Sequence, residues 1–365
     1  MIPCIPSNTK KRNTMKNRIT NTLKNRIPVI CAMIILLSSL AEAKIVFVGA
    51  RTSAEGGLTS DLYVMDDDGS NLRKVTNTVQ RERHPAWSPD GKRIVFTREI
   101  TPQNRGQVII LGKQVTNVFI IDADGSNEQR LTNHQALDSY PLFFPDGKYL
   151  CYLTNVDGET ALHIADVETG KVKQRIKGFI ANPDWSPDGQ DVVYGDRGDI
   201  YIMGSNFRNR EPLLPWPLRD KDIPARINIG FFERYLGQYS PDGRKVMYYE
   251  TAYSTESEPV SSNIFLHDIR LNIQESLPIH KDWRVSGVRW MADGKTIIFS
   301  ADEVGIKNRR HGNYNIYRYH IPSNTTTQLT YLPGRNTRPS WIEGALEVTL
   351  KDKKITRWAE VKVRK

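Results

Sequence analysis

The feature that most restricts the fold of this chain is a short aromatic-Ser-Pro-Asp-Gly motif that recurs along it. Copies begin at Trp87, Phe144, Trp185, Tyr239 and Trp290, and a degenerate sixth copy ends at Trp341. The copy at Phe144 is one residue shorter, and the copy at Trp290 has Met-Ala in place of Ser-Pro. The lead aromatic positions are separated by 57, 41, 54, 51 and 51 residues. Recurrence at this spacing is the signature of a repeat architecture.

Each repeat has the same order of predicted strands and turns. In the repeat that contains Trp87, we expect strands at His84–Ser88, Arg93–Arg98, Asn117–Asp122 and Gln129–Thr132. Pro fits the second position of a type I turn and Gly tolerates a positive φ, so each Pro-Asp-Gly predicts a hairpin turn. The Asp-x-Asp-Gly-Ser-Asn stretches at Asp66–Asn71 and Asp122–Asn127 predict the next hairpin turn. Each unit therefore has four short antiparallel strands.

Six such units predict an all-β fold, a six-bladed β-propeller of four-stranded antiparallel blades. One unit cannot bury both of its faces, and radial stacking solves this problem. The first blade has candidates for its second, third and fourth strands, at Ile45–Gly49, Asp61–Asp66 and Arg73–Thr76, but no aromatic lead strand precedes them. We expect Arg338–Trp341 to supply that strand and close the ring, which removes two open edges. The propeller would span residues 44–342, with a hairpin or basic tail at 343–365.

Residues 1–43 have the features of an export signal. Seven Lys and Arg residues and no acidic residue lie between Lys10 and Arg26, and an apolar run follows from Val29 to Leu40. Ala41-Glu42-Ala43 has the small-x-small pattern that a signal peptidase accepts. The apolar run is shorter than the roughly 20 residues that span a bilayer. We therefore expect cleavage after Ala43, no stable membrane span afterwards, and a periplasmic or secreted mature protein.

The charge distribution argues against a nucleic-acid partner. The net charge of +10 over the whole sequence falls to +4 without residues 1–43, because that segment holds seven basic residues and one acidic residue. In the rest of the chain, charges of both signs alternate, whereas nucleic-acid binding needs a clustered basic stripe.

Linear motifs for catalysis and metal binding are missing. The sequence has no Gly-x-Ser-x-Gly elbow and no His-Glu-x-x-His pair, so we expect a non-catalytic protein without a cofactor or metal. The Asp-x-Asp-Gly stretches lack the Glu that an EF-hand requires at position twelve, and Arg197-Gly198-Asp199 is interpreted as a turn. Cys151 is expected to be a small buried residue of a strand. Some propeller enzymes carry scattered catalytic residues in the channel, so an enzyme stays open as an alternative.

The repeats resemble the propeller repeats of TolB-type proteins. The resemblance rests on Asp61-Leu62-Tyr63-Val64-Met65-Asp66, on Leu131-Thr132 and on the stretch Pro85–Phe96, and it covers residues 44–342. It implies a six-bladed propeller of the bacterial envelope that binds other proteins. TolB itself contacts the peptidoglycan-associated lipoprotein and works with the Tol energy-transducing system. TolB also carries an α/β domain before its propeller, whereas here the first blade is expected directly after Ala43. We expect a monomer.

The strand order separates short connections from long ones. In an antiparallel blade, the first-to-second and third-to-fourth turns lie on one face, and all other connections lie on the opposite face. The predicted insertions at 99–116, 211–235, 251–262 and 301–313 fall on that opposite face, here called the long-loop face. Long loops on a rigid scaffold often carry function, so we expect recognition there.

The connections between blades should surround the mouth of the central channel, and most of their charged side chains are basic. The candidate partner-binding residues are Arg81, Arg83, His84, His134, Asp138, Arg226, Arg234, Arg284, Arg335 and Arg338. One interpretation is a basic mouth for an acidic segment or carboxylate of an envelope protein or peptide. The other is that these are solvated loop residues. The alternative function is an enzyme or binding protein for an acidic extracellular carbohydrate, for which aromatic residues would form a platform. Those aromatic residues are Trp216, Phe231, Phe232 and Trp283.

Overall fold

The computed structural model describes residues 44–52, 58–100, 115–214, 229–306 and 312–343, with the side chains of 229–231 and 236 excepted. The predicted export signal and the predicted C-terminal tail from residue 344 onward therefore lie outside the described residues. Every regular element in the described ranges is a β-strand. In that part of the chain, no helix qualifies as a membrane-spanning segment.

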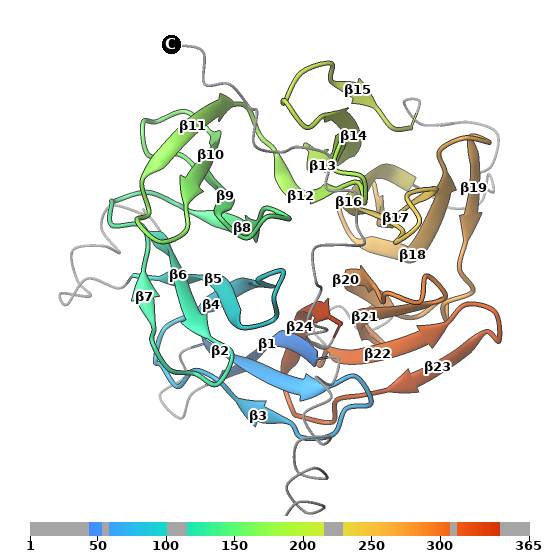
Figure 1. Cartoon of the computed structure of the whole chain (residues 1–365). Coiled ribbons are helices and arrows are strands. Elements are labelled where there is room, and N and C mark those ends of the chain that lie inside the picture. The colour runs from blue at the N-terminus through green and yellow to red at the C-terminus, as the bar shows by residue number, and fades with distance from the viewer. Residues whose placement is uncertain (1–43, 53–57, 101–114, 215–228, 307–311, 344–365) are drawn as a thin grey trace, which may run out of the picture. The chain divides into compact units, whose positions relative to one another are not determined.

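The strands form six four-stranded antiparallel sheets, which Figure 1 shows as the blades of a ring. Blade 1 contains β24 (Arg335–Ile342), β1 (Lys44–Thr52), β2 (Leu58–Asp66) and β3 (Arg73–Lys74). Blade 2 contains β4 (Glu82–Trp87), β5 (Arg93–Glu99), β6 (Thr116–Asp122) and β7 (Gln129–Arg130). Blade 3 contains β8 (Ser139–Phe143), β9 (Tyr149–Thr154), β10 (Ala161–Asp166) and β11 (Val172–Lys177).

The other three blades repeat the same order from the inner to the outer strand. Blade 4 contains β12 (Ala181–Trp185), β13 (Asp191–Asp196), β14 (Asp199–Gly204) and β15 (Glu211–Pro212). Blade 5 contains β16 (Ile229–Tyr239), β17 (Lys245–Ser254), β18 (Pro259–Asp268) and β19 (Ile273–Ser276). Blade 6 contains β20 (Arg284–Trp290), β21 (Thr296–Asp302), β22 (Asn315–His320) and β23 (Thr325–Gln328). The predicted fold class is confirmed.

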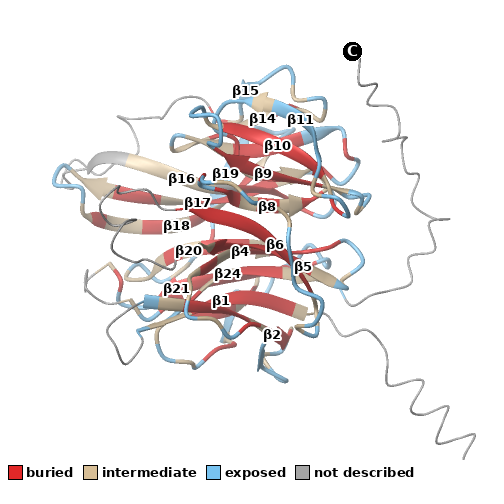
Figure 2. Cartoon of the chain, turned by 90° about the vertical axis from the view of Figure 1, so that its left-hand side faces the viewer, coloured by how far each residue is buried: buried red, intermediate tan, exposed pale blue. Residues whose placement is uncertain are grey.

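The core lies between blades, because each sheet buries both faces of its two middle strands. Six apolar clusters each combine side chains of two neighbouring blades; for example, Val46 and Leu62 of blade 1 pack with Phe96 of blade 2. Strands buried on both faces need continuous apolar runs, such as the run Ile45 to Val48 in β1. Figure 2 shows this burial in the middle strands, with exposed residues in the turns.

Ring closure by the C-terminal strand is confirmed. β24 pairs antiparallel with β1, with Ile45 opposite Trp341 and Lys44 opposite Ile342. Blade 1 thus combines residues from both ends of the propeller, and β1 is paired on both of its edges.

The Pro-Asp-Gly motifs form the predicted hairpin turns. Ser88 Oγ donates to Asp90 Oδ1 at 2.6 Å and accepts from the backbone N of Arg93 at 2.9 Å, and Gly91 has a φ of +68°. The same Ser and Asp contacts recur at Ser186 and Ser240. The turn is therefore specified by residues within five positions of one another. Arg197 and Gly198 also form a turn, between β13 and β14, as predicted.

Two local predictions were wrong. Phe143 pairs with Leu150 as Trp87 pairs with Ile94, and Gly147 N donates to Phe144 O. The third-blade motif is therefore full length and begins at Phe143, with Phe144 in the place of the usual Ser. Two adjacent Phe residues and the missing Ser concealed this alignment.

The second error concerns the insertion predicted at 251–262. Thr251 pairs with Ser262 and Tyr253 pairs with Pro259, so most of this segment extends the β17–β18 hairpin and only residues 255–258 form a connection. Alternating residues such as Ala252 and Ser262 are buried, which favours strand over loop. The other three predicted insertions include residues outside the described ranges.

Candidate functional site

All six inner strands contain an irregularity in pairing, and in four of them it coincides with an X-Pro dipeptide. These dipeptides begin at His84, Tyr140, Asn182 and Arg338, whose φ angles are 54°, 52°, 48° and 55°. Pro has no N–H to donate to a neighbouring strand, so the dipeptide leaves the ladder as a bulge. A positive φ is uncommon in a non-Gly residue, and its recurrence here shows that the bulge is a shared feature of these four inner strands.

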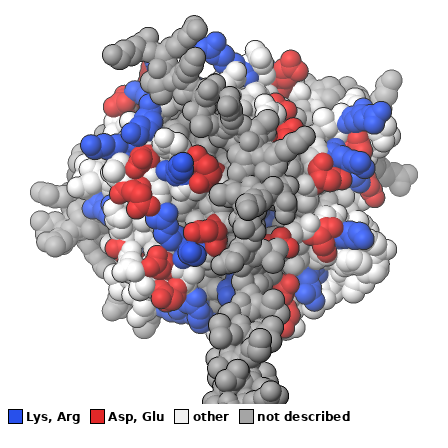
Figure 3. Space-filling model, in the orientation of Figure 1, with Lys and Arg blue, Asp and Glu red and all other residues white. Residues whose placement is uncertain are grey.

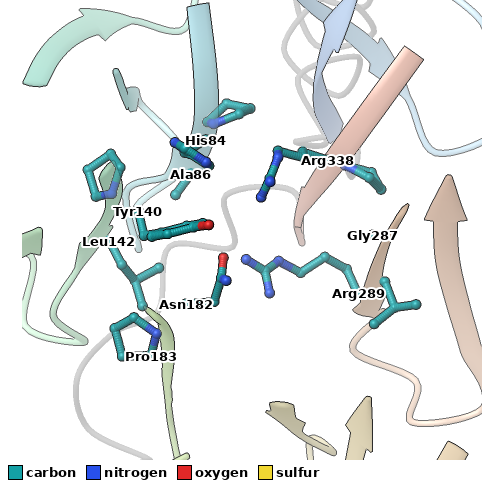
Figure 4. Close-up of a pocket in the computed structure, with 13 residues that line it drawn as sticks. His84, Ala86, Tyr140, Leu142, Asn182, Pro183, Gly287, Arg289 and Arg338 are labelled. Carbon is teal, nitrogen blue, oxygen red and sulfur yellow. The ribbon is translucent and has the colours of Figure 1, made fainter. Parts of the chain in front are cut away.

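The bulges turn side chains into a common pocket, here called the channel pocket. His84, Tyr140, Asn182 and Arg338 line it together with Arg289, so five of the six inner strands contribute. Figure 4 shows these side chains converging from opposite walls. The pocket opens to solvent. All five residues are half-buried.

One wall of the channel pocket consists of two rings in contact, tilted at 48° to each other. The His84 and Tyr140 rings lie 4.2 Å apart, and the Arg338 guanidinium carbon lies 5.6 Å from the Tyr140 ring centre, a cation–π geometry. Thr97 Oγ1 donates to the Arg83 carbonyl and lies 3.2 Å from His84 Nδ1. Since the hydroxyl has one proton, we assign the His84 proton to Nδ1. Burial, followed by the charges of Arg338 and Arg83, lowers the pKa of His84 well below its ordinary value, so the ring is neutral at pH 7.

The opposite wall holds Arg289 beside two polar groups, Asp184 and Gln238. When the Gln238 amide is oriented so that its nitrogen donates to Val288 O at 3.2 Å, its oxygen accepts from Arg289 Nε at 3.1 Å. Burial lowers the pKa of Arg289, and the charges of Asp184 and Arg338 act on it in opposite directions. Within the described part of the chain, no carboxylate lies within ion-pair distance of Arg289 or Arg338.

Gly287 lets β20 and β24 approach each other closely. A Cβ atom at this position would lie 3.4 Å from both Arg338 Cα and Pro339 Cδ, and 3.3 Å from Ser300 Oγ. The small residue therefore brings the backbone of Arg338 next to the strand that carries Arg289. Two guanidinium groups from different blades face one pocket as a result.

Asp184 should make the stability of the fold depend on pH. Burial raises its pKa from 3.8 to about 6, against the opposing effects of the Arg289 charge and of the Tyr239 N–H, which donates to Oδ2 at 3.0 Å. Between these two pH values the folded state holds more protons than the unfolded state, so Asp184 lowers stability as pH rises through this window. The slope is at most roughly 1.4 kcal/mol per pH unit. Urea unfolding from pH 4.5 to 7 should show Asp184→Asn gaining stability relative to wild type as pH rises.

Asp188→Asn provides the matched control for this pH series. Hydrogen bonds from Ser186 and from the Gln190 backbone lower the pKa of Asp188, so its carboxylate is ionised throughout the same window. This variant should differ from wild type by a constant amount from pH 4.5 to 7. Parallel curves for Asp184→Asn and wild type would contradict the assigned pKa.

Of the ten predicted partner-binding residues, the structure places His84 and Arg338 in the channel pocket and Arg83 beside it. Burial lowers the pKa of Arg83, with Glu99, Arg81 and Arg338 among the charges that act on it. Arg226 lies outside the described residues. Partner binding by these residues stays a prediction.

The other six predicted residues have contacts elsewhere. Arg81 Nε donates to Leu58 O at 3.0 Å, and Arg335 lies over the Tyr314 ring at 5.2 Å. Arg234 forms ion pairs with Asp199 at 3.0 Å and Glu250 at 2.9 Å. The remaining three are Arg284, which interacts with Tyr253, and His134 and Asp138, which form a pair at 3.6 Å.

Asp138 belongs to a structural hydrogen-bond lock that recurs between blades. Between blades 2 and 3, Thr132 Oγ1 donates to Asp138 Oδ2 at 2.6 Å. Between blades 1 and 2, Thr76 Oγ1 donates to Glu82 in the same way. In both cases the Thr oxygen also accepts a backbone N–H, and the carboxylate residue precedes or begins the next inner strand. Burial raises the pKa of Asp138. This geometry explains the Leu-Thr ending of the repeats.

Sequence inspection missed Tyr140, Asn182 and Arg289. An available signal for the first two was the X-Pro dipeptide that begins three residues before the lead aromatic, but the misaligned motif at Phe144 hid the position of Tyr140. Arg289 precedes Trp290 without any distinguishing pattern. Its place in the channel pocket follows only from the geometry of β20.

Of the four aromatic residues suggested as a platform, Phe232 is half-buried in β16 and Trp283 has a packing role. The Trp283 ring lies 4.6 Å from the Tyr317 ring and 6.1 Å from the Phe299 ring, so it packs on the core of blade 6. Trp216 and the Phe231 side chain lie outside the described residues. Cys151 is buried as predicted, and burial raises the pKa of its thiol to about 12. In the described ranges, His, Cys, Asp and Glu residues form no group of three or more suited to a metal ion.

Fold and pocket together define a six-bladed β-propeller with a polar, arginine-bearing channel. No family model matches the chain. Its fold is similar to the crystal structure of TolB from Acinetobacter baumannii, with a TM-score of 0.58 and 20% identity over 82% of this chain and 66% of that chain. The chain thus has the TolB-like propeller fold that its repeats predict.

Two curated relatives show similarity at the sequence level. A TolB homolog of Chlorobaculum tepidum is 28% identical over 171 residues, which are 42% of this chain and 38% of that protein. Dipeptidyl-peptidase 5 of Porphyromonas endodontalis is 27% identical over 258 residues, which are 70% of this chain and 34% of that protein. The chain thus spans little more than a third of the length of these relatives.

Proposed function

We propose that this chain is an exported, non-catalytic propeller that binds an acidic segment of a protein or peptide partner in the cell envelope. The partner would approach from the long-loop face and reach the channel pocket. The observation that carries this proposal is the presence of two guanidinium groups, Arg289 and Arg338, in a pocket where the described residues provide them with no ion pair.

The electrostatics favour an anionic group in the channel over one on the outer surface. Figure 3 shows Lys and Arg interspersed with Asp and Glu over the described part of the face in view, without a large patch of one sign. Inside the channel, half-buried guanidinium groups are less screened by solvent, and charge-assisted hydrogen bonds to them are correspondingly stronger. The TolB-like fold makes a peptidoglycan-associated lipoprotein the first partner to test.

An acidic carbohydrate is the second candidate, because a uronic acid carries the same carboxylate that the guanidinium groups would bind. The packing of Trp283 on Tyr317 and Phe299 removes one of the aromatic residues that motivated this alternative. The similarity to a peptidase covers only 34% of that relative, so it supports a shared propeller more than shared chemistry.

Co-purification from envelope extract tests this function. The full-length chain with a C-terminal tag should recover a specific partner, and Arg289→Ala combined with Arg338→Ala should reduce the recovery at least tenfold. Arg244→Ala is the matched control, because Arg244 follows a Pro-Asp-Gly turn at the opposite end of a blade and is exposed. Loss with Arg244→Ala instead would place the site on the other face. No partner, together with turnover of an acidic polysaccharide, would favour the carbohydrate alternative.

A further inference from the structure

The channel pocket is lined by a specific set of hydrogen-bonding groups. Tyr140, Asn182, Arg289 and Arg338 face the same space from four different blades. Each of these side chains can donate at least one hydrogen bond, and the two guanidinium groups offer planar donor pairs. A carboxylate has two oxygens with about four acceptor positions, so it matches this set of donors.

The charge balance favours an anionic group. Arg289 and Arg338 contribute two positive charges, Arg83 adds another beside the pocket, and Asp184 beside Arg289 offsets one of them when it is ionised. His84 contributes none, since its ring is neutral. The other uncharged polar side chains that line the pocket, on β8 and β12, are Tyr140 and Asn182. The surplus of positive charge suits a carboxylate.

The location of the pocket restricts how that carboxylate can arrive. Its lining residues lie within the inner strands, and His84 is the third residue of β4. The space between these inner strands is small and admits no folded module. A chain end enters such a space without a return path, whereas a loop needs room for two strands.

We propose that the channel pocket captures the terminal carboxylate of an extended peptide, held between Arg289 and Arg338 with hydrogen bonds from Tyr140 and Asn182. This inference rests on the proposed partner-binding function and gives it a chemical class of ligand. Capture of a C-terminal carboxylate is an established mode of peptide recognition. The cation–π contact with the Tyr140 ring restricts the Arg338 guanidinium, so less side-chain entropy is lost on binding.

Titration calorimetry on the purified full-length chain tests the inference without the natural partner. The probe is N-acetyl-triglycine with a free carboxylate, and the same peptide with a C-terminal amide is its control. The free acid should bind at least tenfold more tightly than the amide. Equal binding of both, or no binding of the free acid at millimolar concentration, would overturn the inference.

Variants identify the groups that carry the binding. Arg289→Ala and Arg338→Ala should each weaken binding of the free acid at least tenfold, and Tyr140→Phe should weaken it a few-fold because it keeps the ring and removes only the hydroxyl. Arg338→Lys keeps a positive charge at this position. It is included to test whether Arg338→Ala weakens binding only because that variant no longer folds. Arg93→Ala is the matched control, since Arg93 pairs with the exposed Glu168 outside the pocket, and it should bind as wild type does. Unchanged binding in both Arg-to-Ala variants would contradict the assigned site.

Two further comparisons distinguish a failure of this inference from a failure of the proposed function. Succinate tests a small free carboxylate; if it binds as tightly as the peptide, the peptide-end assignment is wrong. If the free acid binds and no envelope partner is recovered, the carboxylate site stands and the proposed function fails. If a partner is recovered equally well by wild type and the Arg variants, and the free acid does not bind, the partner uses another surface and the inference fails.

Discussion

Truncation of the chain after Gly334 should abolish cooperative unfolding or lower the melting temperature by more than about 15 °C. This truncation removes β24, which supplies the inner strand of blade 1 and pairs with β1 from Lys44 to Ala50. It also removes Trp341 and Ile342, which pack against two inter-blade clusters. The lost ladder and apolar contacts together stabilise by roughly 5 kcal/mol or more, which is comparable to the whole stability of many domains.

A second truncation, after Glu343, separates the role of β24 from that of residues 344–365. Both truncated chains lack residues 344–365, and only one of them lacks β24. The difference between their melting temperatures, measured by calorimetry or circular dichroism, therefore reports ring closure alone. Equal melting temperatures for the two truncated chains would show that pairing of β24 with β1 does not hold the ring together.

Replacement of Glu82 by Ala should destabilise the fold by about 3 kcal/mol or more. Glu82 begins β4 and is fully buried, and it accepts hydrogen bonds from Arg98 Nε at 2.8 Å and Nη2 at 2.6 Å and from the Thr76 hydroxyl. Only 7% of the Arg98 side chain is exposed. Without Glu82, Arg98 keeps a single carboxylate partner, Glu128 at 2.6 Å, and the Thr76 hydroxyl loses its acceptor. A partly unpaired buried charge is among the most destabilising changes a point mutation makes.

Urea unfolding of two further variants supplies the comparison. Glu82→Gln keeps the shape and one acceptor oxygen, so its loss of stability should lie between those of wild type and Glu82→Ala. Glu168→Ala removes an exposed ion pair with Arg93, and it should cost less than about 0.5 kcal/mol. If Glu82→Ala were no more destabilising than Glu168→Ala, the buried network would not contribute to the stability of blade 2.

Ring closure and the buried network act at different junctions of the same repeat. β24 closes blade 1 within its own sheet, whereas Glu82 joins the Thr76 segment of blade 1 to the inner strand of blade 2. β24 also contacts β4, the strand that Glu82 begins, so the two effects should be coupled rather than additive.

Much of the fold was predictable from sequence, because its determinants are local and repeated. In the Pro-Asp-Gly turn, Ser88, Asp90 and Gly91 specify the conformation through contacts within five residues. The recurring motif predicted the number of blades, and the extra lead strand at the C-terminal end predicted closure. The alignment failed only at Phe144, where the Ser that anchors the turn is missing.

The candidate site was only partly predictable, for two physical reasons. A bulge changes which side of a strand a residue faces, so a position counted along the chain does not reveal whether its side chain enters the channel. The site also combines residues from blades far apart in sequence, from His84 to Arg338. Arg234, another arginine of an inner strand, is instead held by Asp199 and Glu250. Sequence alone thus determined the repeat, the blade number and the closure, through short-range turn chemistry and strand periodicity. Only the tertiary structure decided which arginines share a pocket, because that depends on the geometry of the bulges and on how the inner strands of different blades converge around the channel.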